Sequence, residues 1–237
     1  MTLVLCAHGT RSPAGRATVA AVVEAVARTS GRPVRDAYVD VHGPALPDVL
    51  ASGDTVVPLL LSRGHHADVD VAGAAARVGD VAVCPPLGPS QVLARMLRTR
   101  LLEAGLRPGH TVVLAAAGSS RPEAADHVRG VAADLGALLG AVVTPAFVAA
   151  PAGCGMPAVT DLVADAGGVG CEVAVASYLL APGAFHDRVL RSGAAVASAP
   201  LALPDRVDRC LVDLVLQRSE QRVEWPTRTP VLGAARL

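Results

Sequence analysis

The sequence has 237 residues, of which 51% are hydrophobic, 18% charged and 2% aromatic. This composition excludes a wholly disordered chain, and it predicts a core of aliphatic side chains. The 21 basic residues balance the 21 acidic ones, which argues against a nucleic-acid binder because such proteins carry a basic excess.

Short apolar runs alternate with helical patterns along the whole chain. We predict strands at 2–7, 34–41, 55–61, 80–84, 111–117, 142–149, 172–178 and 194–198. We predict the main helices at 13–29, 90–105, 122–140 and 204–221. Alternation of this kind is typical of an α/β fold, in which helices cover a parallel sheet.

The sequence also repeats itself. TLVLCAHGTRSPAG at 2–15 aligns without a gap with TVVLAAAGSSRPEA at 111–124, and PLLLSRGHHAD at 58–68 aligns with SYLLAPGAFHD at 177–187. The offset between the repeats grows from 109 to 119 residues, which the Gly-rich stretch at 151–170 can absorb. Ordered matches of this kind indicate an internal duplication.

Two similar halves follow from this duplication. Each is predicted to be a flavodoxin-like or Rossmann-like unit, with a four-stranded parallel sheet in the order 2-1-3-4 flanked by helices. We place the N-terminal half at 1–108, a degenerate C-terminal half at 109–222 and a flexible tail at 223–237. Because one chain then supplies both walls of a cleft, we expect a monomer.

Three features of the sequence predict a cytoplasmic protein. The N-terminal run MTLVLCAHG has no basic region and is too short for a signal peptide. The longest uncharged stretch, 135–160, is interrupted by prolines and glycines, so we expect no membrane span. The five cysteines form no CxxC pair, which suits a reducing compartment and offers no iron–sulfur or structural zinc framework.

Histidines follow two strands that the predicted order makes neighbours. The loops after the first and third strands of the N-terminal half, 7–13 and 60–70, share one edge of the sheet. His8 and either His65 or His66 can therefore face a common cleft. The second half carries no imidazole at the positions that match His8 and His66, which predicts one working site facing a companion wall.

The other histidines receive weaker assignments. His42 follows a strand and can join the cluster, although a turn role is favoured. His110 and His127 are assigned to a linker and to a helix surface. His186 can line the cleft or form a surface pair with Asp187, and its role is left open.

These motifs resemble those of the class II chelatases, specifically the two-halved sirohydrochlorin chelatase family. HGTR at 8–11 matches the family motif HG[ST]R, and PLLLSRGHHADVDVA at 58–72 matches the family run PLFLxxGxHxxxDIP. Val71 replaces the usual isoleucine. Ala72 replaces the usual proline, which matters little if that proline only helps to open the next helix. The resemblance covers the N-terminal half well and the C-terminal half through the degenerate repeat.

The resemblance implies a chelatase-like fold and a lyase that inserts Fe²⁺ or Co²⁺ into sirohydrochlorin or a closely related tetrapyrrole. Such a reaction belongs to sirohaem or cobalamin biosynthesis. The resemblance makes His8 and His66 the catalytic pair and the metal ligands, and the register from Gly64 selects His66 over His65. The metal ion is then a substrate, and no permanently bound cofactor is expected.

Imidazole is suited to this chemistry. It accepts protons near neutral pH, and it is a borderline ligand for Fe²⁺ or Co²⁺. Two histidines leave coordination sites open, so the ion can be passed on. Whether each histidine acts as ligand, base or both stays open.

Arginine binds carboxylates in a planar fork, which suits the polycarboxylate substrate that the resemblance implies. Arg11 and Arg63 flank the two histidines, and Arg121 holds a comparable place in the second half. The predicted substrate-binding residues are Gly9, Thr10, Arg11, Arg63, Gly64, His65, Ser119, Ser120 and Arg121.

The same motifs are compatible with two other functions. HGTRSP at 8–13 contains the HGxRxP part of a histidine phosphatase pattern, in which His8 would be the nucleophile and His186 with Asp187 a downstream pair. Against it, Ala7 replaces the arginine of that pattern, and the repeat is left unexplained. A non-catalytic metal or tetrapyrrole carrier would use the same ligands as the chelatase.

Overall fold

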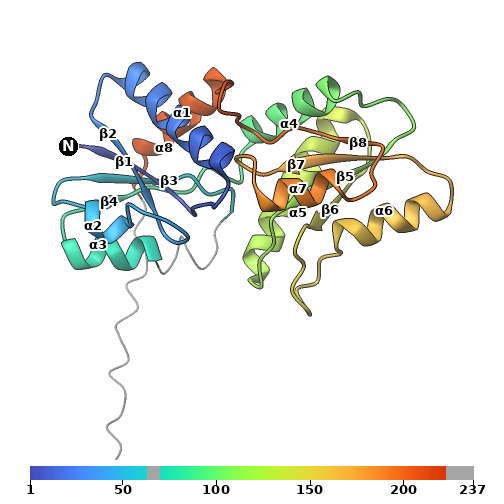
Figure 1. The fold of residues 1–237 in the computed structure, drawn as a ribbon, viewed down its shortest axis with the longest axis horizontal. Coiled ribbons are helices and arrows are strands. Elements are labelled where there is room, and N and C mark those ends of the chain that lie inside the picture. Colours follow the sequence, from blue (N-terminus) through green and yellow to red (C-terminus); the bar gives the residue numbers. More distant parts are fainter. Residues whose placement is uncertain (63–69, 223–237) are drawn as a thin grey trace, which may run out of the picture.

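The computed structural model describes residues 1–62 and 70–222 (Figure 1). The predicted site residues Arg63, Gly64, His65 and His66 lie outside the described residues, as does the tail from residue 223.

Strands and helices alternate along the described chain (Figure 1). The N-terminal half contains β1 (Leu3–Ala7), α1 (Pro13–Ser30), β2 (Val34–Tyr38), α2 (Leu46–Val49), β3 (Thr55–Pro58), α3 (Ala72–Val78), β4 (Ala82–Val83) and α4 (Gln91–Glu103). The C-terminal half contains β5 (Thr111–Ala116), α5 (Pro122–Leu139), β6 (Val143–Phe147), α6 (Val159–Gly168), β7 (Val173–Tyr178), α7 (Ala184–Leu190), β8 (Val196–Ala197) and α8 (Arg209–Ser219). The predicted strands and main helices are all present. Only α8 begins clearly later than predicted, because Leu203 and Arg206 first close a tight backbone turn.

The strands form two parallel sheets, in the orders β2-β1-β3-β4 and β6-β5-β7-β8. This confirms the predicted order in both halves. The duplication also appears in the strand register, because Leu5 lies opposite Val57 and the matching Leu114 lies opposite Ala176. The two halves are therefore copies of one fold.

Local sequence signals explain why these elements form. Every residue of β1 is buried, as is usual for a parallel strand covered on both faces. Helix α1 begins where the Ser12 hydroxyl accepts a hydrogen bond from the Gly15 N–H, with Pro13 as the first helical residue. It ends at Gly31, whose φ of 63° is left-handed. These signals place the first turn of α1 directly after the predicted histidine loop.

The last helix of each half packs on the other half. Helix α4 contacts α5 and β7 of the C-terminal half, whereas α8 contacts α1 and β3 of the N-terminal half. Figure 1 shows α8 beside α1 and α4 beside α5. The boundary at 108/109 stays a prediction, since the sheets lie on either side of it while both helices cross it.

Arg100 holds α4 against the C-terminal half. Its side chain is 1% exposed. Its guanidinium donates to the backbone oxygens of Pro200 and Leu201 at 3.2 and 3.1 Å, and it pairs with Asp208 at 2.7 Å. A buried charge requires such a complete set of partners, because desolvating it without them is costly.

Arg218 of α8 also donates hydrogen bonds to backbone oxygens of the half that its helix covers. It donates to the backbone oxygens of Leu87 and Pro89 at 3.1 and 3.2 Å. Counted from the helix starts at residues 91 and 209, Arg100 and Arg218 are both the tenth residue. Each exchanged helix thus brings an arginine to the backbone that follows the last strand of the half it covers.

Across the residues that the structure describes, no helix has both the length and the apolarity to span a membrane.

Replacing Arg100 by alanine should lower the free energy of unfolding by about 3–5 kcal/mol, because it removes one partner of a buried ion pair. Arg209→Ala is the matched control. Arg209 is 73% exposed and pairs with Asp213 one turn along α8, so its loss should cost less than about 0.5 kcal/mol. Urea unfolding of both variants measures the difference, and equal costs would contradict the role given to Arg100.

Candidate functional site

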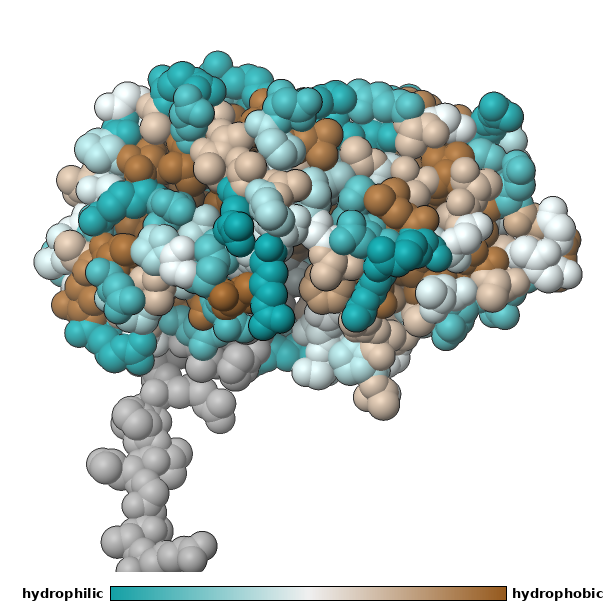
Figure 2. All heavy atoms as spheres, in the orientation of Figure 1, coloured by the Kyte–Doolittle hydropathy of each residue, from teal (hydrophilic) through white to brown (hydrophobic). Residues whose placement is uncertain are grey.

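A cavity of about 670 Å³ lies between the two halves. Figure 2 shows the surface hollowed there, with hydrophilic side chains on either side. The lining comes from the loops that follow β1, β3, β5 and β7 and from the starts of α1, α5 and α7. The volume lies within the roughly 300–1,000 Å³ that is usual for small-molecule sites. The carboxyl ends of the central strands of both sheets therefore open into one space.

The structure brings several predicted residues to this cavity and leaves others away from it. The predicted residues that line it are His8, Gly9, Thr10, Arg11, Ser119 and Ser120. Arg121 is the N-cap residue of α5 and is not among the lining residues. The roles of all these residues remain predictions.

His8 follows β1, and its side chain is exposed. Its backbone oxygen accepts a hydrogen bond from the Asp40 N–H at 3.0 Å. In the second half, the Ala117 oxygen accepts from the Ala149 N–H at 2.9 Å. His8 and Ala117 therefore hold the same place in their halves, but one offers an imidazole to the cavity and the other a methyl group. Asp40, which sequence reasoning did not single out, lies beside His8 through this contact.

Gly9 has to be glycine because the backbone passes close behind it. Its φ is +105°, and a Cβ at this position would lie 2.1 Å from the backbone oxygen of Asp40. Gly118 repeats the arrangement, with a φ of +136° and a Cβ position 2.1 Å from the backbone oxygen of Ala149. These glycines let the chain turn sharply at the cavity in both halves.

His42 supports the loop after His8. Its Nδ1 accepts a hydrogen bond from the Thr10 N–H at 3.3 Å, and its ring centroid lies 3.9 Å from that of Tyr38. It is not among the lining residues. The structure thus favours a supporting role for His42, close to the predicted turn role.

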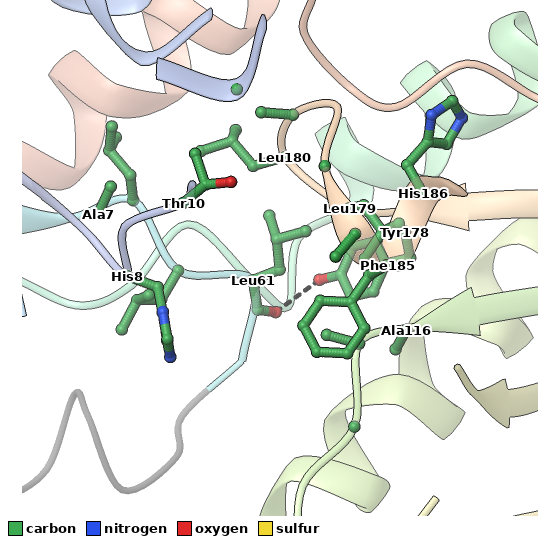
Figure 3. A pocket seen from close by; sticks show the side chains of 18 of the residues that line it. Ala7, His8, Thr10, Leu61, Ala116, Tyr178, Leu179, Leu180, Phe185 and His186 are labelled. Carbon is green, nitrogen blue, oxygen red and sulfur yellow. Dashed lines mark hydrogen bonds between the residues drawn. The ribbon is translucent and has the colours of Figure 1, made fainter. Parts of the chain in front are cut away.

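A tyrosine from the C-terminal half reaches the N-terminal wall of the cavity. The Tyr178 hydroxyl donates to the backbone oxygen of Leu61 at 2.6 Å, as Figure 3 shows. Burial raises the pKa of Tyr178 above its usual range, so the hydroxyl keeps its proton. A Cβ at Gly88 would lie 2.0 Å from the same Leu61 oxygen. The Tyr178–Leu61 hydrogen bond joins residues 117 apart in the sequence, and sequence reasoning missed it.

The cavity is mainly apolar, and an arginine lies in its lining. Apolar walls come from both halves, including Leu59, Leu61, Leu179 and Leu180. Among the lining residues that the structure describes, Arg11 is cationic, two are histidines and none is acidic. Such a space favours an anionic ligand with a large apolar surface.

His186 belongs to the lining, but its ring is engaged elsewhere. Its Nε2 lies 3.2 Å from the backbone oxygen of Ser198. Because a carbonyl only accepts, Nε2 carries the proton of this hydrogen bond. Figure 3 shows His186 away from His8. Within 1–62 and 70–222, no three histidine, cysteine or acidic side chains gather closely enough to hold a metal ion.

Gly9→Ala should destabilise the fold more than Gly31→Ala does. Both residues have positive φ, but a Cβ at Gly31 meets nothing within 4 Å. Gly31→Ala should therefore lose about 1 kcal/mol from backbone strain alone. Gly9→Ala should lose a further ~1–3 kcal/mol from overlap with the Asp40 oxygen. Free energies of unfolding in urea test this, and equal losses would argue against the close approach.

Tyr178→Phe should loosen the backbone at Leu61, because the carbonyl oxygen loses its donor. We expect a loss of about 1–2 kcal/mol of stability, together with faster hydrogen exchange at the amides of residues 60–62. Tyr38→Phe is the control, because the matching residue in the second half, Phe147, is already a phenylalanine. Unchanged exchange in Tyr178→Phe would refute the anchoring of Leu61.

Comparisons with known proteins agree with the resemblance found in the sequence. Residues 2–104 match the family model described as CbiX. No curated protein matches the chain. SirB from Bacillus subtilis with Fe³⁺ is 20% identical to the chain with a TM-score of 0.75, and the alignment covers 92% of this chain and 94% of that one.

Two further solved structures have the same fold. The sirohydrochlorin chelatase SirB from Bacillus subtilis subspecies spizizenii, in complex with cobalt, is 19% identical with a TM-score of 0.72, covering 92% of this chain and 93% of that one. A multi-domain protein from Deinococcus radiodurans with structural similarity to chelatases is 19% identical with a TM-score of 0.66. That alignment covers 94% of this chain and 55% of the other.

These matches bear on the alternatives as well as on the family. The structural matches extend over both halves of the internal repeat. The histidine phosphatase alternative leaves this repeat unexplained and is not favoured. Residues 2–104 therefore match the CbiX family model, and across both halves the chain has the fold of the sirohydrochlorin chelatase SirB.

Proposed function

We propose that this chain inserts a divalent metal ion, Fe²⁺ or Co²⁺, into sirohydrochlorin or a closely related tetrapyrrole. The observation that carries the proposal is the large apolar cavity with His8 and Arg11 on its N-terminal side. A tetrapyrrole with peripheral carboxylates needs flat apolar walls, nearby cations and a basic group. The proposal is supported by the CbiX match and by the SirB structures, which hold iron in one case and cobalt in the other.

His8 has the chemistry that the first step requires. The free macrocycle must lose two pyrrole protons as the metal ion enters, and neutral imidazole accepts protons near neutral pH. The side chain of His8 is exposed at the cavity, so it can reach either the ion or a pyrrole N–H. Imidazole also ligates Fe²⁺ and Co²⁺, and the two roles can follow each other on one ring.

His66 is proposed as the partner of His8, from the family motif alone. It lies outside the described residues, and the chain enters that segment from Leu61 and Ser62, which line the same cavity. Two histidines would hold the ion loosely enough to release it. A closed set of four protein ligands would trap it instead.

Peripheral carboxylates are assigned to arginines and to the loop backbones. We propose that Arg11, Arg63 and Arg121 bind carboxylates through their guanidinium groups. The loops at 8–11 and 118–121 supply further donors, which include the predicted residues Thr10, Ser119 and Ser120. Gly64 and His65 complete the proposed substrate-binding set.

The cofactor, the pathway, the location and the oligomeric state are proposed as well. The metal ion is a substrate, and no permanently bound cofactor is needed for insertion. The product would serve sirohaem or cobalamin biosynthesis. A cytoplasmic location is proposed from the scattered cysteines, and a monomeric state from the presence of both cavity walls in one chain.

His8→Ala and His66→Ala should each lower the rate of metal insertion by roughly a hundredfold or more, because each removes a base or ligand at the reacting centre. His127→Ala, on α5 and outside the cavity lining, is the control and should keep the wild-type rate. The assay follows the absorbance of sirohydrochlorin with Fe²⁺ or Co²⁺ in the absence of oxygen.

Equal rates with and without the wild-type protein would contradict the proposed activity. Tight binding of sirohydrochlorin without acceleration would instead favour the carrier. Phosphatase activity that depends on His8 alone would favour the rival enzyme.

A further inference from the structure

We propose that Phe185 of α7, a lining residue, forms a substrate-binding plate on the C-terminal wall of the cavity, together with Arg188, which lies over the Phe185 ring just outside the lining: the phenyl ring contacts the face of the macrocycle and the guanidinium takes one of its carboxylates. The inference rests on the proposed function and assigns a part of the site to the half that carries no catalytic histidine.

Phe185 is unlike the other aromatic residues that the structure describes. Its side chain is 41% exposed, whereas Phe147, Tyr38 and Tyr178 are between 1% and 4% exposed. An exposed phenylalanine forfeits the burial that usually stabilises this side chain. Phe185 also belongs to the cavity lining. Figure 3 shows its ring on the C-terminal side of the cavity, across from His8.

Phe185 occupies the position of the repeat at which the N-terminal half has a histidine. The alignment of 58–68 with 177–187 pairs Phe185 with His66. A phenyl group neither ligates a metal ion nor accepts a proton, so this wall has no acid–base chemistry at the matching place. It offers a flat apolar ring instead. Aromatic rings attract each other in offset or edge-on arrangements, and a tetrapyrrole presents a broad conjugated face.

Arg188 adds a positive charge next to this ring. It lies three residues after Phe185, on the same side of α7, and its Cζ is 5.9 Å from the ring centroid. The guanidinium lies over one face of the ring. Its planar donors match a carboxylate, and tetrapyrroles of the proposed class carry carboxylates at the edge of the conjugated face.

Two residues, His186 and Asp187, lie between Phe185 and Arg188 in the sequence. His186 is held by the backbone oxygen of Ser198 at 3.2 Å. The first turn of α7 therefore presents the Phe185 ring to the cavity, while the His186 ring, although it belongs to the lining, hydrogen-bonds to the protein backbone. The resulting plate lies opposite the proposed metal-handling residue, so a bound macrocycle would have the metal approach on one face and the phenyl contact on the other.

The test measures binding and turnover separately. Phe185→Ala should raise both the Kd for metal-free sirohydrochlorin and the KM for metallation by about tenfold, with kcat changed less than twofold. Phe185→Tyr should keep wild-type values because the ring remains. Arg188→Ala should raise Kd by about threefold and reduce its dependence on salt. Leu190→Ala, at an exposed position on the same helix outside the lining, is the control.

Binding of Co²⁺ alone should be unchanged in all of these variants. Wild-type activity together with an unaltered Kd in Phe185→Ala would overturn the plate and leave the proposed function standing. A fall in kcat at constant KM would also overturn it, because that result assigns Phe185 to the reacting centre. If the wild type neither binds nor metallates sirohydrochlorin, the proposed function fails and the plate fails with it.

Discussion

The exchange of α4 and α8 between the halves is the constraint on which the cavity depends. Each sheet is covered by a helix that follows the other sheet in sequence, so neither half has its full set of helices without the other. The buried guanidinium of Arg100 and its counterpart Arg218 hold these helices to backbone carbonyls. In this arrangement the loops after β1 and β5 line one cavity between the halves. A site built from two halves depends on how the halves are held together, because small displacements of reacting groups slow chemistry strongly.

Duplication supplies two copies of the loop geometry, and the two copies have diverged in chemistry. Gly9 and Gly118 make the same sharp turn against a neighbouring backbone oxygen, but His8 precedes one and Ala117 the other. The proposed division of labour follows from this difference. We propose that the N-terminal wall handles protons and metal, while the C-terminal wall, with Phe185, holds the macrocycle. Tyr178 ties the walls together, because it is buried in one half and donates to a cavity-lining carbonyl of the other.

The strands and their order could be predicted from the sequence, and so could the shared edge at which the loop after β1 and the start of the loop after β3 line one cavity. Buried parallel strands are continuous apolar runs, and the repeat confirms their spacing. The helix exchange could not be predicted in this way. The apolar pattern of α8 shows that one face is buried, but it does not show which of the two sheets that face covers. The Tyr178–Leu61 hydrogen bond joins residues 117 apart and has no local signal. Arg121 was predicted from its place in the repeat, but it is the N-cap residue of α5 and is not part of the cavity lining.

The central claim is that one half binds the metal ion and the other does not. Anomalous diffraction at the cobalt edge, from crystals of the wild-type protein soaked with Co²⁺, locates the ion directly. The account predicts one strong peak in the cavity at bonding distance from a ring nitrogen of His8, and no peak beside Ala117. A strongest peak outside the cavity, for example at the exposed Cys171, or equal peaks in both halves would contradict it.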